Sequence, residues 1–254
     1  FEQDLVKAPA GILLHPMQSD PFIEPINRAI ETGTEVATFA ADSPNSNRTA
    51  YITSDNHAEA KFAAEEIVSQ IGDSAEYAVL ENPGQSNHDL RVTALVSYRE
   101  THYPNMKLVG RQATNQDSNA AYRATASIVQ ANPALGAIWI PEAGSAEGAV
   151  AAILEAKSDV LIMHADVTPA TLEHIKAGNI HMALNPNQGM QGFMGFLSVF
   201  FAAHSNVFDP FNDYKVSGFN PMQIPYVDNG FAVITQDNAD SFDLNTYMAD
   251  RDPS

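Results

Sequence analysis

One pattern recurs along this chain of 254 residues: a short apolar run ends in a polar residue, and a helical segment with clear start and stop signals follows. The stretch from Val160 to Pro169 is an example, because its apolar run leads to Asp166, Thr168 suits a helix N-cap and Pro169 suits the first helical position. Gly178 suits the end of that helix. Residues at the carboxyl ends of parallel strands face the crevice where α/β proteins bind ligands. Asp166 is therefore a candidate site residue.

Apolar runs of strand length alternate with helical patterns along most of the chain. The runs lie at Gly11–Leu14, Val36–Phe39, Ala50–Thr53, Tyr77–Leu80, Ala137–Ile140, Val160–Met163, Ile180–Leu184 and Gly230–Thr235. The helical patterns lie at Asn56–Ile71, Ser86–Tyr103, Asp117–Ala131, Ser145–Ala156 and Thr168–Ala177. Regular alternation of this kind predicts parallel sheets flanked by helices, so the predicted fold class is α/β.

Three further segments give local expectations. Asn56 and Glu59 have the spacing of a capping box at the start of a helix. The apolar stretch Phe193–Ala203 predicts a buried helix, and it is too short for a membrane span, which needs about 20 residues. The stretch Phe208–Asp228 carries three prolines among aromatic residues without helical period, which predicts a long crossover.

Composition excludes several classes of function. The chain has 13 Lys plus Arg against 31 Asp plus Glu, a formal net charge of −18, and such a balance repels nucleic-acid phosphates and anionic membrane surfaces. With no cysteine there is neither a disulfide nor thiol catalysis. Dinucleotide-binding, phosphate-loop and nucleophile-elbow motifs are absent from the sequence. We therefore expect no nucleic-acid partner and no nucleotide cofactor.

A metal site is not indicated either. None of the eight histidines has the spacing of a zinc motif, and His164 with Asp166 would give only two ligands. His164 is better explained as a structural or ligand-contacting residue. The acidic stretch that begins at Asp237 lacks the glycine and the final glutamate of a calcium loop, so it predicts a solvated turn; its members are Asp237, Asn238, Asp240 and Asp243.

An ordered series of motifs runs through the first part of the chain. The strand Gly11–Leu14 leads to His15 and Pro16, a second strand leads to Asp42, and Ala50–Thr53 leads into Ser-Asp-Asn at Ser54–Asn56. This series resembles the sugar-binding periplasmic proteins related to ribose-binding protein. Each motif is weak alone, while their order along the chain is fairly specific.

The resemblance continues over nearly the whole chain. The segment Glu81–Gly84 that leads to Arg91 is similar to the family segment whose arginine clamps the ligand. Glu142 follows a strand where the family has a polar ligand contact, Asp166 matches the aspartate that binds sugar hydroxyls, and Asn185 matches a further polar contact. The resemblance implies substrate-binding roles for His15, Asp42, Arg91, Glu142, Asp166 and Asn185, with no catalytic and no metal-binding residue. Carboxylates, amides and a guanidinium are the groups that match sugar hydroxyls.

The resemblance also implies a two-lobed periplasmic-binding-protein type I fold. Residues 1–54 plus 187–228 would form the N-terminal lobe, and residues 55–186 plus 229–254 the C-terminal lobe, with the ligand in a cleft that closes by hinge motion. The family normally has a βαβα stretch of about 50 residues, one and a half βαβ units, before the strand at Gly11. That stretch is missing from this sequence, so we expect the N-terminal lobe to be incomplete and the native polypeptide to be longer.

Two departures bear on the ligand. Ala40 occupies the place of the family's ligand-binding aspartate, so Asp42 is the expected substitute. His15 and Glu142 stand where the ribose-binding pattern has asparagines. The identity of the sugar is therefore left open.

The function implied by the resemblance is that of a monomeric extracytoplasmic solute-binding protein, periplasmic or extracellular and in some cases lipid-anchored. It would bind a monosaccharide or small polyol without turnover and deliver it to the permease of an ABC importer, or present it to a membrane sensor. One alternative is the effector domain of a regulator related to the lac repressor, which would require an upstream DNA-binding segment. Another is a sugar-acting enzyme that uses Asp166 and Glu142 as a carboxylate pair.

Overall fold

The computed structural model describes residues 1–207 and 224–242, so most of the predicted crossover at 208–228 lies outside the described residues. The described chain divides into two compact units. Unit 1 comprises Phe1–Asp55, Gly84–Asn87 and the described residues of Asn187–Gly230. Unit 2 comprises Asn56–Pro83, His88–Pro186 and the described residues of Phe231–Ser254.

Unit 2 is built on a six-stranded sheet with the order β10-β8-β7-β6-β4-β5. All neighbouring strands are parallel except β10 and β8, which are antiparallel. The strands are β4 (Glu76–Glu81), β5 (Lys107–Ala113), β6 (Leu135–Ile140), β7 (Leu161–Ala165), β8 (Met182–Pro186) and β10 (Phe231–Thr235). The predicted α/β class is confirmed.

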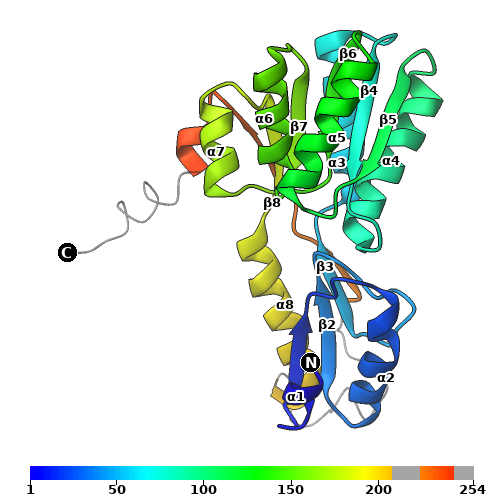
Figure 1. The fold of residues 1–254 in the computed structure, drawn as a ribbon. Helices are drawn as coiled ribbons and strands as arrows, with labels where there is room; N and C mark the ends of the chain where they lie inside the picture. Colours follow the sequence, from blue (N-terminus) through cyan, green and yellow to red (C-terminus); the bar gives the residue numbers. More distant parts are fainter. Residues whose placement is uncertain (208–223, 243–254) are drawn as a thin grey trace. The chain divides into compact units, whose positions relative to one another are not determined.

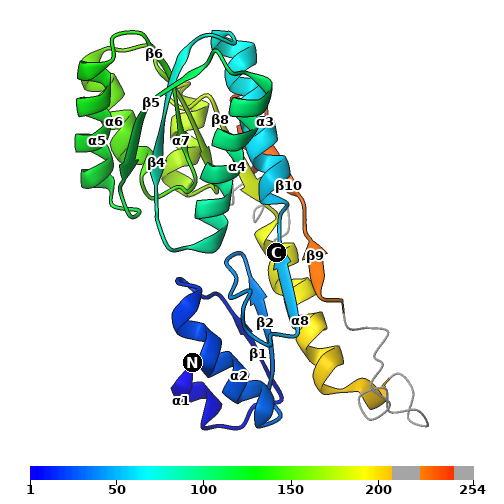
Figure 2. The same cartoon turned by 90° about the vertical axis from the view of Figure 1, so that its right-hand side faces the viewer.

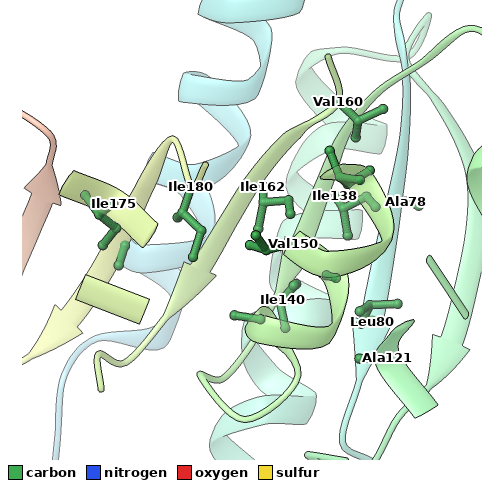
Figure 3. Packing of buried hydrophobic residues seen from close by; sticks show 14 of the residues in the cluster. Ala78, Leu80, Ala121, Ile138, Ile140, Val150, Val160, Ile162, Ile175 and Ile180 are labelled. Atoms are coloured by element: carbon green, nitrogen blue, oxygen red, sulfur yellow. The ribbon is translucent and has the colours of Figure 1, made fainter. Parts of the chain in front are cut away.

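Helices cover both faces of this sheet (Figure 2). The five helices are α3 (Asn56–Ile71), α4 (Ser86–His102), α5 (Ser118–Ala131), α6 (Ala146–Ala156) and α7 (Pro169–Lys176). Residues of α5, α6 and α7 pack on one face with strand residues such as Ile138, Ile140 and Ile162, as Figure 3 shows. Residues of α3 and α4 pack on the other face around Tyr77 and Trp139. Successive strand residues therefore serve two separate cores, and the interiors of β4, β6, β7 and β8 are mostly apolar, as is typical of central parallel strands.

The strand order places a topological switch point in unit 2. From β4 the chain passes through α4 to β5 on one side, then returns through α5 to β6 on the other side of β4. The connections that leave the carboxyl ends of β4 and β6 therefore run in opposite directions. In open α/β sheets, ligands bind outside the carboxyl ends of the strands at such a point.

Unit 1, whose strands β2 and β3 are labelled in Figure 1, has a four-stranded parallel sheet with the order β1-β2-β3-β9. Its strands are β1 (Gly11–Leu14), β2 (Glu35–Phe39), β3 (Ala50–Thr53) and β9 (Tyr226–Asp228). Helix α8 (Gln188–Ala203) packs on one face around Val199. Helices α1 (Glu2–Leu5) and α2 (Ile23–Glu31) supply apolar residues to a second cluster that includes Ile26 and Val36.

Helix α8 differs from the prediction of a buried helix. Val199 is buried against the sheet, whereas the side chains of Phe193 and Phe196 are 55% and 60% exposed within the described chain. The helix therefore has one packed face and one exposed aromatic face. Hydrophobicity along the sequence could not distinguish these faces, because both are apolar.

Candidate functional site

Three predicted site residues come together at the carboxyl edge of the unit 2 sheet. Arg91 lies in the second turn of α4, Glu142 follows β6 and Asp166 follows β7. These elements border the switch point, and Arg91 contacts both of the neighbouring segments. The edge of the sheet thus gathers a guanidinium and two carboxyl groups from positions far apart in the sequence.

The Arg91 side chain is 1% exposed and has well-defined partners. Its Nε donates to Oε2 of Glu59 at 2.6 Å, and its Nη1 donates to the main-chain oxygen of Pro141 at 3.0 Å. Nη1 also lies 3.5 Å from Oδ2 of Asp166. A buried charge needs such partners, because desolvation of an unpaired guanidinium would be very costly.

Asp166 has backbone angles that are unusual for a residue with a side chain. Its φ is 64°, in the left-handed region, where only glycine is free of strain. Its main-chain N–H donates to the carbonyl of Leu184 at 2.9 Å, which fixes this conformation at the strand end. The side chain is 25% exposed, in contrast to the buried Arg91 beside it. Local strain of this kind is concentrated at functional sites.

The carboxyl group of Glu142 is buried, with the residue 1% exposed. Oε2 accepts a hydrogen bond from the main-chain N–H of Ser145 at 3.1 Å, while Oε1 has no hydrogen-bond partner among the described residues. Burial raises the pKa of Glu142, and the charge of Asp166 raises it further, whereas hydrogen bonds from Ser145 and Gly144 lower it. Glu142 thus has a buried polar atom without a partner among the described residues, at the carboxyl edge of the sheet.

Two further polar side chains of unit 2, Asn185 and His164, lie in strands β8 and β7. Asn185, in β8, is half-buried, and its Oδ1 has no partner among the described residues. His164 is fully buried in β7; its Nδ1 donates to the carbonyl of Ala165 at 3.0 Å, and its Nε2 has no partner in the described chain. Burial lowers the pKa of His164 to about 4, so this imidazole is neutral at physiological pH.

The two predicted residues of unit 1 differ in how they are engaged. His15 follows β1, and its ring lies 5.3 Å from that of Phe39. The buried Asp42 carboxylate pairs with Arg48, with Nη2 2.6 Å from Oδ2, and accepts from Thr38 Oγ1 at 2.6 Å and from the Ser43 N–H at 2.8 Å. These partners hold Asp42 within unit 1. The binding roles of both residues stay predictions.

The sequence did not predict that Glu59 would be the partner of Arg91. The spacing from Asn56 to Glu59 predicted a capping box, but Oδ1 of Asn56 has no hydrogen-bond partner among the described residues, and the Glu59 carboxylate pairs with Arg91. Glu59 is fully buried. Arg91 lies 32 positions further along the chain, so nothing local in the sequence could reveal this pair.

Two other features, a metal-binding group and a membrane-spanning helix, are not found in the described part of the chain. Residues 1–207 and 224–242 contain no group of three or more His, Asp or Glu side chains placed to hold a metal ion, and Asp243 of the acidic stretch lies outside these ranges. No described helix is both long enough and apolar enough to cross a membrane.

Comparison with known proteins places these features in a family. A family model described as a periplasmic binding protein domain matches residues 1–202. The D-apiose import binding protein of Actinobacillus succinogenes is 29% identical over 129 residues, which cover 50% of this chain and 41% of that relative. The chain therefore matches less than half the length of this curated relative.

Solved structures show the same architecture. An arabinose-binding protein from Geobacillus stearothermophilus is 26% identical and superimposes with a TM-score of 0.80 over 95% of this chain and 82% of that chain. A sugar-binding protein of a sugar ABC transporter from Bacillus halodurans, at 24% identity, has the same fold, with a TM-score of 0.80 over 95% of this chain and 83% of that chain. The predicted resemblance is confirmed, and the chain belongs to the periplasmic binding protein domain family.

Proposed function

We propose that this chain binds a monosaccharide or small polyol outside the cytoplasm and delivers it to the permease of an ABC importer. The observation that carries this proposal is the convergence of Arg91, Glu142 and Asp166 at the switch point of unit 2, where Glu142 Oε1 is buried without a partner among the described residues. Buried polar atoms in folded proteins normally have hydrogen-bond partners. A sugar hydroxyl at this edge would provide one.

The chemistry of the edge suits a polyhydroxylated ligand. Asp166 offers carboxylate oxygens that accept from hydroxyls, Arg91 donates, and the half-buried Asn185 amide can do both. Charge-assisted hydrogen bonds of this kind are about twice as strong as neutral ones. The names of the similar proteins, an apiose import binding protein and an arabinose-binding protein, support a sugar as the ligand class.

Binding without turnover is part of the proposal. The family consists of binding proteins, and the sugar-acting enzyme considered from sequence would need Glu142 and Asp166 to act on a bound substrate. The regulator alternative has no observation in its favour, and the net charge of −18 opposes contact with DNA.

The first experiment is a thermal-shift screen with pentoses, hexoses and small polyols. A ligand that binds only the folded state raises the melting temperature by mass action, and isothermal titration then gives the affinity. A negative result with every sugar and polyol would contradict the proposal, as would chemical conversion of a ligand during incubation.

Substitution at the two ends of one strand tests the position of the site. Asp166→Ala should weaken binding at least roughly tenfold, because it removes a charge-assisted hydrogen bond worth about 1.5–3 kcal/mol. The matched control is Asp159→Ala, since Asp159 is exposed and precedes the same strand, β7. A second control, Arg123→Ala, alters an exposed residue of α5. Both controls should keep wild-type affinity.

A further inference from the structure

We infer that Glu59 makes the site selective for uncharged ligands by neutralising Arg91. This inference rests on the proposed function, and it assigns a specificity-determining role to a residue that need not touch the ligand. Glu59 is therefore a positioning residue. Its carboxylate is fully buried and lies 2.6 Å from Nε of Arg91.

The charges of the edge support this role. Arg91 contributes +1, Glu59 −1 and Asp166 −1, which sum to −1 before Glu142 is counted. An ionised Glu142 brings the sum to −2. The arginine that could attract an anion is thus outnumbered by the carboxylates around it.

The hydrogen bonds of Arg91 lead to the same conclusion. Arginine recognises carboxylates and phosphates through pairs of parallel N–H bonds from its planar fork. In this chain Nε is engaged by Glu59, and Nη1 is engaged by Pro141 and lies beside Asp166. The two parallel pairs of an arginine are Nε with Nη2 and Nη1 with Nη2, so one donor of each pair is committed within the protein. An incoming anion would also face Asp166.

Wild-type protein provides a first test that needs no variant. Titrations would compare D-galactose with D-galacturonate and D-ribose with D-ribose 5-phosphate. Each anionic ligand should bind at least about tenfold more weakly than its neutral counterpart at about 20 mM salt, and the gap should narrow at about 0.5 M salt, where charge repulsion is screened. Affinity for the neutral sugar should change little with salt.

The variant Glu59→Gln tests the residue itself. It keeps the size of the side chain but removes the charge, so the ratio of anionic to neutral affinity should rise roughly ten- to thirtyfold, the effect of one charge about 8 Å away at an effective dielectric constant near 20. The matched control is Glu66→Gln, which removes a charge in α3 that pairs with His181 at 2.8 Å. This control should leave the ratio unchanged.

The outcomes separate the inference from the proposed function. Wild-type protein that binds an anionic ligand as well as its neutral counterpart, or better, would overturn the inference and leave the proposed function intact. Equal losses for both ligands in Glu59→Gln would show a merely structural role and also overturn it. If Glu59→Gln does not fold, the wild-type salt series still decides whether the site rejects anions, and equal binding of anionic and neutral ligands there would overturn the inference. Absence of binding by any neutral or anionic sugar would overturn the proposed function and this inference together.

Discussion

Arg91 and Glu59 form a fully buried ion pair, and this arrangement affects stability as well as binding. Removing one partner of a buried pair leaves the other charge in a low-dielectric environment without compensation, and this is usually more damaging than removing both. If Arg91 were only a binding residue, Arg91→Ala would weaken ligand binding and leave folding intact. The structure shows that this variant would also strand the Glu59 carboxylate.

We therefore predict that Arg91→Ala lowers the free energy of unfolding by about 3–5 kcal/mol, in addition to any loss of binding. The control is Arg111→Ala, because Arg111 pairs with Glu81 at the same short distance of 2.6 Å but is 48% exposed. An exposed pair contributes at most about 1 kcal/mol. Urea unfolding followed by circular dichroism measures both changes. Similar losses in the two variants would mean that burial does not determine how much an ion pair contributes to the free energy of unfolding.

Residue types at the site could be predicted from sequence, but their partners could not. The acid after β7 and the arginine in α4 follow from strand-end position and family resemblance, and both lie at the carboxyl edge of unit 2. The engagement of Asp42 by Arg48 and that of Arg91 by Glu59 depend on tertiary packing. The sequence can therefore indicate where a site residue lies, whereas the side chain it pairs with becomes known only from the fold.

Helices α5 and α6 approach each other closely at Gly148. A Cβ atom at this position would lie 1.9 Å from the carbonyl oxygen of Ser118 and 2.9 Å from the main-chain nitrogen of Tyr122. Both are main-chain atoms, which cannot move aside as the end of a flexible side chain can. The pairing of these helices therefore requires glycine at this position.

We predict that Gly148→Ala lowers the free energy of unfolding by about 1–3 kcal/mol or more, because the helices must separate to admit the methyl group. Gly192→Ala is the matched control. Gly192 lies inside α8, and a Cβ atom added there would have no described atom within 4 Å apart from its chain neighbours and the nearby backbone of the helix itself. Alanine should therefore stabilise that helix by up to roughly 1 kcal/mol. Opposite signs in urea unfolding would confirm the close approach, and stabilisation by both substitutions would contradict it.

Central elements could be predicted from the sequence better than edge elements. The strands β6, β7 and β8 are buried on both faces and appear as apolar runs, and Thr168 with Pro169 marks the start of α7 as expected. Strand β5 was missed, because it lies at the edge of the sheet and its last three residues, Arg111–Ala113, are exposed. Half-exposed strands do not need the apolar pattern that identifies buried ones.

At the scale of the whole molecule, electrostatics acts through the net charge and through individual buried groups. The chain has 31 acidic and 13 basic residues, so its many carboxylates repel one another at neutral pH. Partial protonation of surface carboxylates relieves this repulsion as pH falls. A loss of stability as pH falls must therefore come from specific groups. His164, which is fully buried, is the group best placed to cause such a loss.

We predict that stability falls between pH 6.5 and pH 4 because of His164. The imidazole binds a proton near pH 6.5 in the unfolded chain but only near pH 4 in the folded protein, so the unfolded state gains the proton first as pH falls. The full effect is on the order of 3 kcal/mol. His164→Gln should flatten this part of the pH profile, measured as unfolding free energy in urea at each pH. Ile162→Val, which shortens a buried neighbour on β7, should lower stability at every pH by about 0.5–1.5 kcal/mol and keep the wild-type slope. An unchanged slope in His164→Gln would assign the acid sensitivity to other groups.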